Sequence, residues 1–149
     1  MSTTIHATAI VIDGTGLLIR GPSGSGKSSL ALALLRAPAV RFARLVADDR
    51  VIPRVSGGRL LADAPPPIRG LLEVRGVGLV SWPVLAPAKI DLIVDIGDGP
   101  RLPEGEEIDH LLGVPLRRVQ LSPRDVFGET RALLILGTIR TSRGKPLAS

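Results

Sequence analysis

The chain has 149 residues, which is enough for one domain with its own hydrophobic core. It contains no cysteine, which excludes disulfides, thiolate metal sites and thiol catalysis. Its 19 basic and 14 acidic residues give a formal net charge of +5, which suggests anionic partners. Aromatic residues make up only 2% of the chain, so stacking surfaces for single-stranded nucleic acid are scarce and we expect no nucleic acid partner.

No apolar segment approaches the roughly 18 residues of a membrane span. The first six residues also lack the basic start and apolar stretch of a signal peptide. We therefore expect a cytoplasmic protein that does not bind a membrane. One domain is expected over residues 1–149, with a loose tail at 141–149.

The predicted elements are mostly short strands. Strands are predicted at residues 5–12, 17–20, 45–47, 51–55, 59–62, 90–96 and 116–121. Helix formers fill residues 27–36 and Pro38 follows, which predicts a helix there. We expect a helical turn at 108–112. The apolar run at 131–139 fits a buried helix or a strand, and its opening Arg-Ala pair favours the helix. The pattern predicts one α/β domain that is rich in strands and has few helices.

Between the second strand and the first helix the chain reads GPSGSGKS, an unbroken match to the phosphate-binding P-loop G-x-x-x-x-G-K-S. Its glycines allow backbone amides to surround phosphate oxygens at the positive end of the following helix. The lysine can reach the β- and γ-phosphates, and the last serine can bind Mg²⁺. The residues of the motif are Gly21, Pro22, Ser23, Gly24, Ser25, Gly26, Lys27 and Ser28.

A P-loop protein also needs an acidic side chain near the metal ion, usually at the end of a neighbouring apolar strand. Two places in the chain meet this description. Residues 45–47 are followed by Asp48 and Asp49, and residues 92–94 are followed by Asp95. Paired carboxylates can divide the work, with one on the metal and the other accepting a proton. Aspartate also ends strands in ordinary turns, and spacing alone leaves both places open.

Two further features accompany the P-loop and the acidic pair in a fixed order. His6 lies 15 residues before the first P-loop glycine, and residues 72–80 read LEVRGVGLV. The ordered set resembles the catalytic domain of bacterial HPr kinase/phosphorylase, whose signature reads E-[IV]-R-G-[LV]-G. The resemblance implies a P-loop kinase-like α/β fold, of the type shared by HPr kinase and PEP carboxykinase, with a mixed sheet and few helices.

The activity that this resemblance implies is bifunctional. With ATP and Mg²⁺, the kinase reaction moves the γ-phosphate to a serine of HPr, a small phosphocarrier protein. In the reverse direction inorganic phosphate removes the phosphoryl group from phosphoserine-HPr and gives pyrophosphate. The family also implies a homo-oligomer, namely a hexamer.

The resemblance assigns a phosphate and metal site. Lys27 and the rest of the P-loop hold the phosphates. Ser28 binds Mg²⁺, and Asp49 and Glu73 support the metal site. Arg75 helps to shape the signature segment near the phosphates.

The resemblance also assigns proton transfer. Asp48 is the general base for phosphorylation and the general acid for dephosphorylation, and His6 assists it. A carboxylate beside a cation and an imidazole can serve both directions.

The chain departs from the long members of the family. It begins almost at His6, as do the short forms that consist of the catalytic domain alone. Ser29 stands where an acidic residue often follows the P-loop serine, and residues 121–127 only loosely resemble the family loop P-V-R-P-G-R-N that contacts HPr. An alternative function is a small-metabolite P-loop kinase that uses Asp95 as its metal carboxylate. A third is a nucleotide-binding regulatory module that transfers no phosphate.

Overall fold

The structure is a computed structural model that describes residues 3–97, 107–122, 135–137 and 139. Its helices are α1 (Lys27–Leu35) and the 3-10 helix η1 (Pro66–Ile68), and residues 135–137 and 139 are also helical. Its strands are β1 (Ile5–Ile12), β2 (Thr15–Arg20), β3 (Ala43–Ala47), β4 (Arg50–Ser56), β5 (Arg59–Asp63), β6 (Leu71–Val74), β7 (Gly78–Ser81), β8 (Ala88–Lys89), β9 (Leu92–Ile96), β10 (Glu107–Leu111) and β11 (Val114–Leu121).

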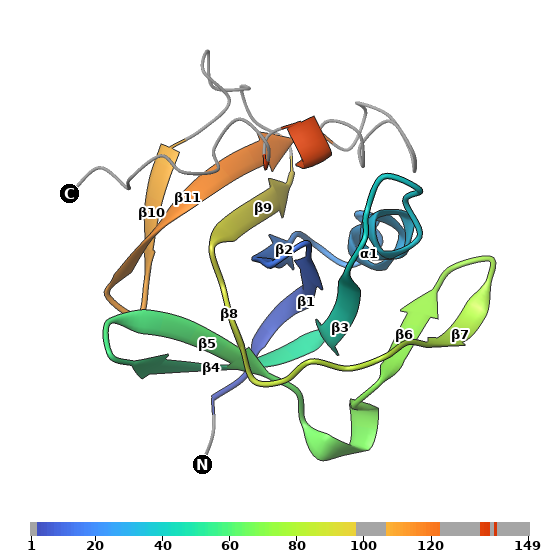
Figure 1. Ribbon diagram of the computed structural model, residues 1–149, viewed down its shortest axis with the longest axis horizontal. Helices are drawn as coiled ribbons and strands as arrows, with labels where there is room; N and C mark the ends of the chain where they lie inside the picture. The colour runs from blue at the N-terminus through green and yellow to red at the C-terminus, as the bar shows by residue number, and fades with distance from the viewer. Residues whose placement is uncertain (1–2, 98–106, 123–134, 138, 140–149) are drawn as a thin grey trace.

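Nine of these strands form one mixed sheet. Eight follow the order β10-β11-β9-β2-β1-β4-β5-β8, and β3 pairs separately with β1. Strand β9 is parallel to both of its neighbours, β2 and β11, whereas the other pairs are antiparallel. Strands β6 and β7 form a separate antiparallel hairpin. The predicted α/β class, with a mixed sheet and few helices, is confirmed over the described residues (Figure 1).

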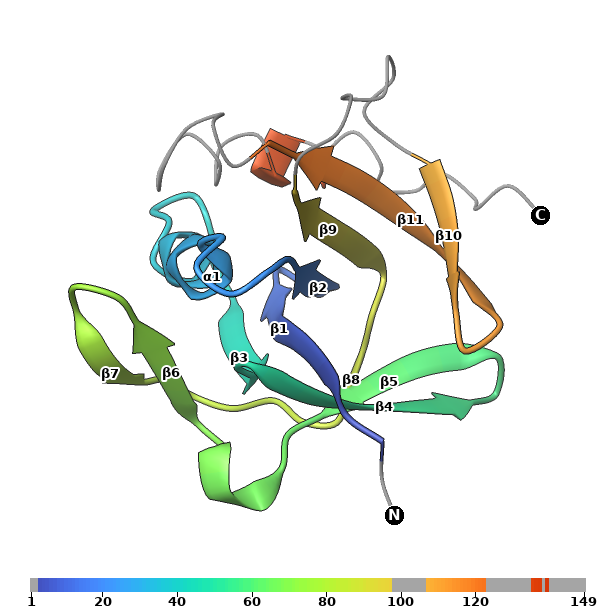
Figure 2. The ribbon, with the colours of Figure 1, turned by 180° about the vertical axis from the view of Figure 1, so that it is seen from behind.

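The two faces of the large sheet bury two separate apolar clusters. Because side chains alternate along a strand, Ile10 and Ile12 of β1 point to one face and Ala9 and Val11 to the other. Helix α1 packs on the first face, and the β6–β7 hairpin contributes Leu72 to the same cluster. Figures 1 and 2 show α1 between the central strands and this hairpin. Strands β4, β5 and β8 contribute to the cluster on the other face.

The predicted strands and the P-loop helix agree with the observed elements to within two residues at either end. The predicted helical turn at 108–112 is wrong, because residues 107–111 form β10. Leu112 and Gly113 have φ angles of 51° and 81°, and this tight turn pairs β10 with β11. Of the predicted helix at 131–139, residues 135–137 and 139 are helical; its other residues and the expected tail lie outside the described residues. No helix in the described part of the chain is long and apolar enough to cross a membrane.

Candidate functional site

The P-loop connects β2 to α1, and its glycines allow its path. Gly24 and Gly26 have φ angles of 80° and 97°, in the left-handed region that side chains disfavour. A Cβ added to Gly21 would lie 2.7 Å from the carbonyl oxygen of Ile96, so the loop starts tightly against the end of β9. The loop leads directly into the N-terminus of α1, where helical amides have no partner within the helix. This geometry supports the predicted phosphate-binding role.

Lys27 is folded back over the start of the loop. Its Nζ donates hydrogen bonds to the carbonyl oxygens of Gly21, at 2.8 Å, and Pro22, at 3.1 Å. Burial lowers the pKa of the Lys27 ammonium below its ordinary value of 10.5, and the negative charges of Asp49 and Asp48 offset part of that shift. The ammonium therefore lies within the field of the acidic pair, at the place where phosphates are expected.

The acidic pair lies at a break between two strands that share one edge of β1. Strand β3 pairs with residues 9–12 of β1, and β4 pairs with residues 5–6. The chain bends between them, where Asp49 adopts a left-handed φ of 68°. As a result Asp48 is only 6% exposed, whereas the Asp49 side chain is 66% exposed. Adjacent carboxylates thus have different surroundings.

Asp48 contacts three other parts of the fold from the bend that follows β3. Its Oδ1 accepts hydrogen bonds from the hydroxyl groups of Ser28 and Thr8, each at 2.7 Å. Its Oδ2 accepts a hydrogen bond from the backbone N–H of Glu73, at 2.9 Å. The P-loop helix, β1 and the β6–β7 hairpin therefore converge on one carboxylate.

The other predicted site residues lie around this point. His6 Nε2 lies 2.8 Å from Asp49 Oδ1, so the imidazole contacts Asp49 and not Asp48. Glu73, on β6, and Arg75, which follows β6, are both exposed to solvent. Sequence reasoning missed Thr8, although a hydroxyl in the otherwise apolar run from residue 7 to 12 is a signal that a buried polar partner exists.

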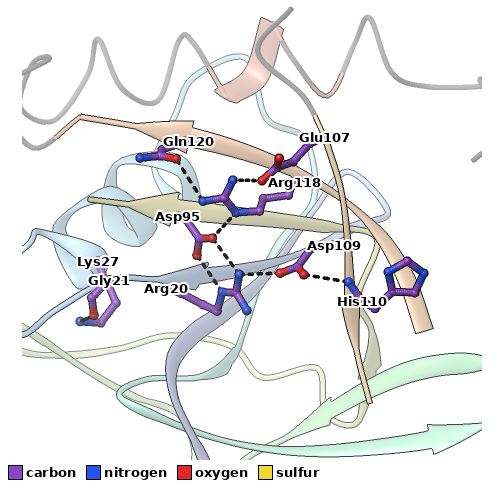
Figure 3. Close-up of polar contacts among 9 residues, drawn as sticks. All are labelled: Arg20, Gly21, Lys27, Asp95, Glu107, Asp109, His110, Arg118 and Gln120. Carbon is purple, nitrogen blue, oxygen red and sulfur yellow. Dashed lines mark hydrogen bonds and ion pairs between the residues drawn. The ribbon is translucent and has the colours of Figure 1, made fainter. Parts of the chain in front are cut away.

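Asp95, the second candidate carboxylate, belongs to a different network. It lies on the face of β9 opposite to α1, because its neighbours Val94 and Ile96 belong to the cluster beneath the helix. Its oxygens accept hydrogen bonds from Arg20 Nε and Nη2, both at 2.7 Å, and from Arg118 Nε (Figure 3). The sheet therefore separates Asp95 from Ser28, which removes the structural basis for Asp95 as the metal carboxylate.

The network around Asp95 continues along the same face. Arg20 also donates to Asp109 at 2.9 Å, and Arg118 contacts Glu107 and Gln120 (Figure 3). Burial acts to raise the pKa of Asp95, but hydrogen bonds and ion pairs from the two arginines outweigh it and hold the pKa below its ordinary value of 3.8. Asp95 is therefore charged, and both of its carboxylate oxygens accept hydrogen bonds from arginines.

Comparison with known proteins decides the family. A family model described as the HPr serine kinase C-terminal domain matches residues 1–95. The chain belongs to this family. The matched range contains the P-loop, the acidic pair and the β6–β7 hairpin, so the resemblance inferred from the ordered motifs is confirmed.

The curated relatives that the chain matches are considerably longer than this chain. An HPr kinase/phosphorylase from Bordetella petrii is 34% identical over an alignment of 155 positions, which covers 95% of this chain and 48% of that protein. One from Clostridium botulinum is 34% identical over 135 residues, which cover 82% of this chain and 43% of that protein. The chain therefore spans about half the length of the curated relatives that it matches.

A solved structure agrees with the fold. The HPr(Ser) kinase/phosphatase from Coxiella burnetii superposes with a TM-score of 0.80 at 25% sequence identity. The similarity covers 95% of this chain and 96% of that one. The mixed P-loop fold expected from the resemblance is thus confirmed.

The donor set beside the P-loop fits a magnesium ion. Mg²⁺ prefers oxygen ligands and is usually held by one or two carboxylates together with water and phosphate oxygens. The Ser28 hydroxyl and the Asp48 carboxylate, 2.7 Å apart, offer such oxygens. Asp49 follows Asp48 in the chain, and the exposed residue Glu73 donates its backbone N–H to Asp48. Among the residues that the structure describes, no group of three or more His, Asp or Glu side chains is already arranged to hold a metal ion.

Proposed function

We propose that the chain is an ATP-dependent protein serine kinase that phosphorylates HPr. The observation that carries the proposal is the contact between Ser28 Oγ and Asp48 Oδ1, which joins the phosphate loop to a strand-end carboxylate. Its relatives are named HPr kinase/phosphorylase, which supports HPr as the acceptor. Phosphoryl transfer needs positioning and charge neutralisation, and the P-loop, Lys27 and a Mg²⁺ ion supply both.

Each residue of the site has a separate role in the proposed phosphoryl transfer. The P-loop amides and Lys27 hold the phosphates of ATP. Ser28, Asp49 and Glu73 would hold Mg²⁺, which would neutralise phosphate charge. Asp48 accepts the proton of the attacking serine hydroxyl, because its carboxylate carries no ion pair with any described residue and stays available as a base. His6 acts on this centre through its contact with Asp49.

We also propose the reverse reaction. Inorganic phosphate attacks the phosphorus of phosphoserine-HPr, the serine oxygen leaves, and Asp48 returns its proton to that oxygen. The products are HPr with an unmodified serine hydroxyl and pyrophosphate. The same carboxylate serves both directions, as microscopic reversibility requires.

The kinase reaction is tested with radiolabelled ATP, Mg²⁺ and HPr. We expect one labelled serine, and Lys27→Met should lower the transfer rate at least about 100-fold because a cationic partner of the phosphates is lost. Lys89→Met is the matched control, since Lys89 is exposed and pairs with Asp91 instead. Tight ATP binding without transfer would identify a regulatory module, and labelling of a small metabolite in place of HPr would also contradict the proposal.

The phosphorylase reaction is tested by adding phosphate to phosphoserine-HPr and measuring pyrophosphate. Release of orthophosphate alone would contradict phosphorolysis. We further propose a homohexamer in the cytoplasm, where ATP and a phosphocarrier substrate are both present. Light scattering after size-exclusion chromatography measures the assembly directly.

A further inference from the structure

Thr8 is a buried polar residue at the candidate site that the functional assignments above leave without a role. The residue is 0% exposed, and its hydroxyl donates to Asp48 Oδ1 at 2.7 Å. Buried hydroxyl groups in proteins have hydrogen-bond partners, and here the partner is the carboxylate on which the proposed chemistry depends.

Strand pairing brings these two side chains together. In the β1 ladder Ala9 pairs with Ala47, and His6 pairs with Arg50. The segment between Ala47 and Arg50, which contains the acidic pair, therefore passes directly beside Thr8. Because Thr8 has the same parity along β1 as Ile10, its side chain points to the face that carries α1 and the P-loop.

The hydroxyl of Thr8 differs from the other donors in how firmly it is held. Strand β1 has β2 along one edge and β3 and β4 along the other, so Thr8 lies in the middle of the sheet. Ser28 belongs to the P-loop and is also the expected Mg²⁺ ligand. The Glu73 amide belongs to the separate β6–β7 hairpin. Thr8 is thus the donor anchored in the large sheet itself.

We propose that Thr8 is a positioning residue whose hydroxyl fixes the orientation of the Asp48 carboxylate against Ser28. Valine has almost the same shape and would pack equally well on this face, so the hydroxyl is the feature that matters. The inference deepens the proposed function and rests on it for the part played by Asp48 in phosphoryl transfer.

The test compares three variants. Thr8→Val removes the hydroxyl and keeps the shape, Thr8→Ser keeps the hydroxyl, and Thr15→Val makes the same chemical change on β2 at the turn end of the β1–β2 hairpin. Loss of a partner that orients a catalytic or metal-binding group typically costs 10- to 100-fold. We expect Thr8→Val to lower kcat by about that factor with little change in the KM for HPr, and Thr8→Ser and Thr15→Val to stay within about threefold of the unmodified chain.

A second measurement does not depend on turnover. Binding of a non-hydrolysable ATP analogue is titrated calorimetrically with and without Mg²⁺. Ser28 is a proposed Mg²⁺ ligand, and its hydroxyl donates to Asp48 at 2.7 Å. If Thr8 holds Asp48 in place, Thr8→Val should weaken the Mg²⁺-dependent part of binding about tenfold and leave binding without Mg²⁺ unchanged. Circular dichroism and thermal unfolding check that each variant is folded.

The outcomes separate the two proposals. If Thr8→Val matches the unmodified chain in both measurements, or if Thr8→Ser is as impaired as Thr8→Val, the positioning role is wrong. The unmodified chain could also transfer no phosphate to HPr while Thr8→Val alone weakens Mg²⁺-dependent binding of the ATP analogue. In that case the proposed function fails and the role of Thr8 at the nucleotide site stands.

Discussion

Asp48 and Asp95 both lie at the end of an apolar strand in the same sheet, yet the fold uses the two carboxylates differently. Asp95 is held by two guanidinium groups, from Arg20 and Arg118. Asp48 is held by two hydroxyl groups and one backbone amide, and it forms no ion pair with a described residue. Both carboxylates are oriented, but only one is neutralised.

This difference supports the proposal that Asp48, and not Asp95, takes part in the chemistry. A fixed cation in contact with a carboxylate compensates its charge permanently, so an incoming metal ion or proton gains little by approaching it. Neutral donors orient a carboxylate and leave its full negative charge available. Asp48 therefore suits its proposed role as proton acceptor beside the Mg²⁺ site, whereas Asp95 suits a structural role on the opposite face of the sheet.

The largest expected effect is on activity. Asp48→Asn should lower the rate of phosphoryl transfer to HPr by about 10²- to 10⁴-fold, because the base is lost while its shape is kept. Asp95→Asn makes the same chemical change on the opposite face and should stay within about threefold of the unmodified rate. Steady-state kinetics with labelled ATP measures both variants. A severe loss in Asp95→Asn together with a mild one in Asp48→Asn would reverse the assignment.

The next effect is on stability, where we expect Asp95→Asn to be more damaging than Asp48→Asn. Asp95→Asn should lower the free energy of unfolding at pH 7 by about 1.5 kcal/mol, since two partly buried arginines lose their shared counter-ion. Asp48→Asn should change it by less than about 1 kcal/mol, because relief of repulsion from Asp49 offsets the lost bond from the Glu73 amide. Urea denaturation followed by circular dichroism gives both values.

The stabilisation by Asp95 should also depend on pH. Its pKa is lower in the folded chain than in the unfolded one, so its contribution is complete above the unfolded value near 3.8 and is lost as the pH falls through the folded value. The difference between the unmodified chain and Asp95→Asn should therefore shrink at acidic pH. A difference that grows on acidification would contradict the ion-pair account.

The smallest effect is expected at the exposed rim of the arginine network. Glu107 contacts Arg118 with a side chain that is 45% exposed. Glu107→Gln should change the free energy of unfolding by no more than about 0.5 kcal/mol, because water and salt screen an exposed pair. Adding 1 M salt should remove most of that difference in urea denaturation. A difference that persists in 1 M salt would contradict the expectation that solvent screens the pair between Glu107 and Arg118.

Much of this protein is encoded locally, and those parts could be predicted. The P-loop is eight consecutive residues whose glycines meet conformational requirements that other residues resist, and Gly24 and Gly26 have the left-handed φ angles that the motif implies. Apolar patterning predicts β1 with its observed bounds. The predicted helical turn at 108–112 is wrong because a segment of five residues has weak local preference, and pairing with β11 decides its conformation.

By itself the sequence determined the strand-rich α/β class, the phosphate loop and, through the order of its motifs, the family. The tertiary structure alone decided which carboxylate meets the P-loop serine. The direction of a side chain on a strand depends on the register of that strand, and register is set by partners far away in the chain. Pairing of β3 and β4 with β1 places Asp48 beside Thr8 and Ser28, whereas the register of β9 turns Asp95 to the opposite face.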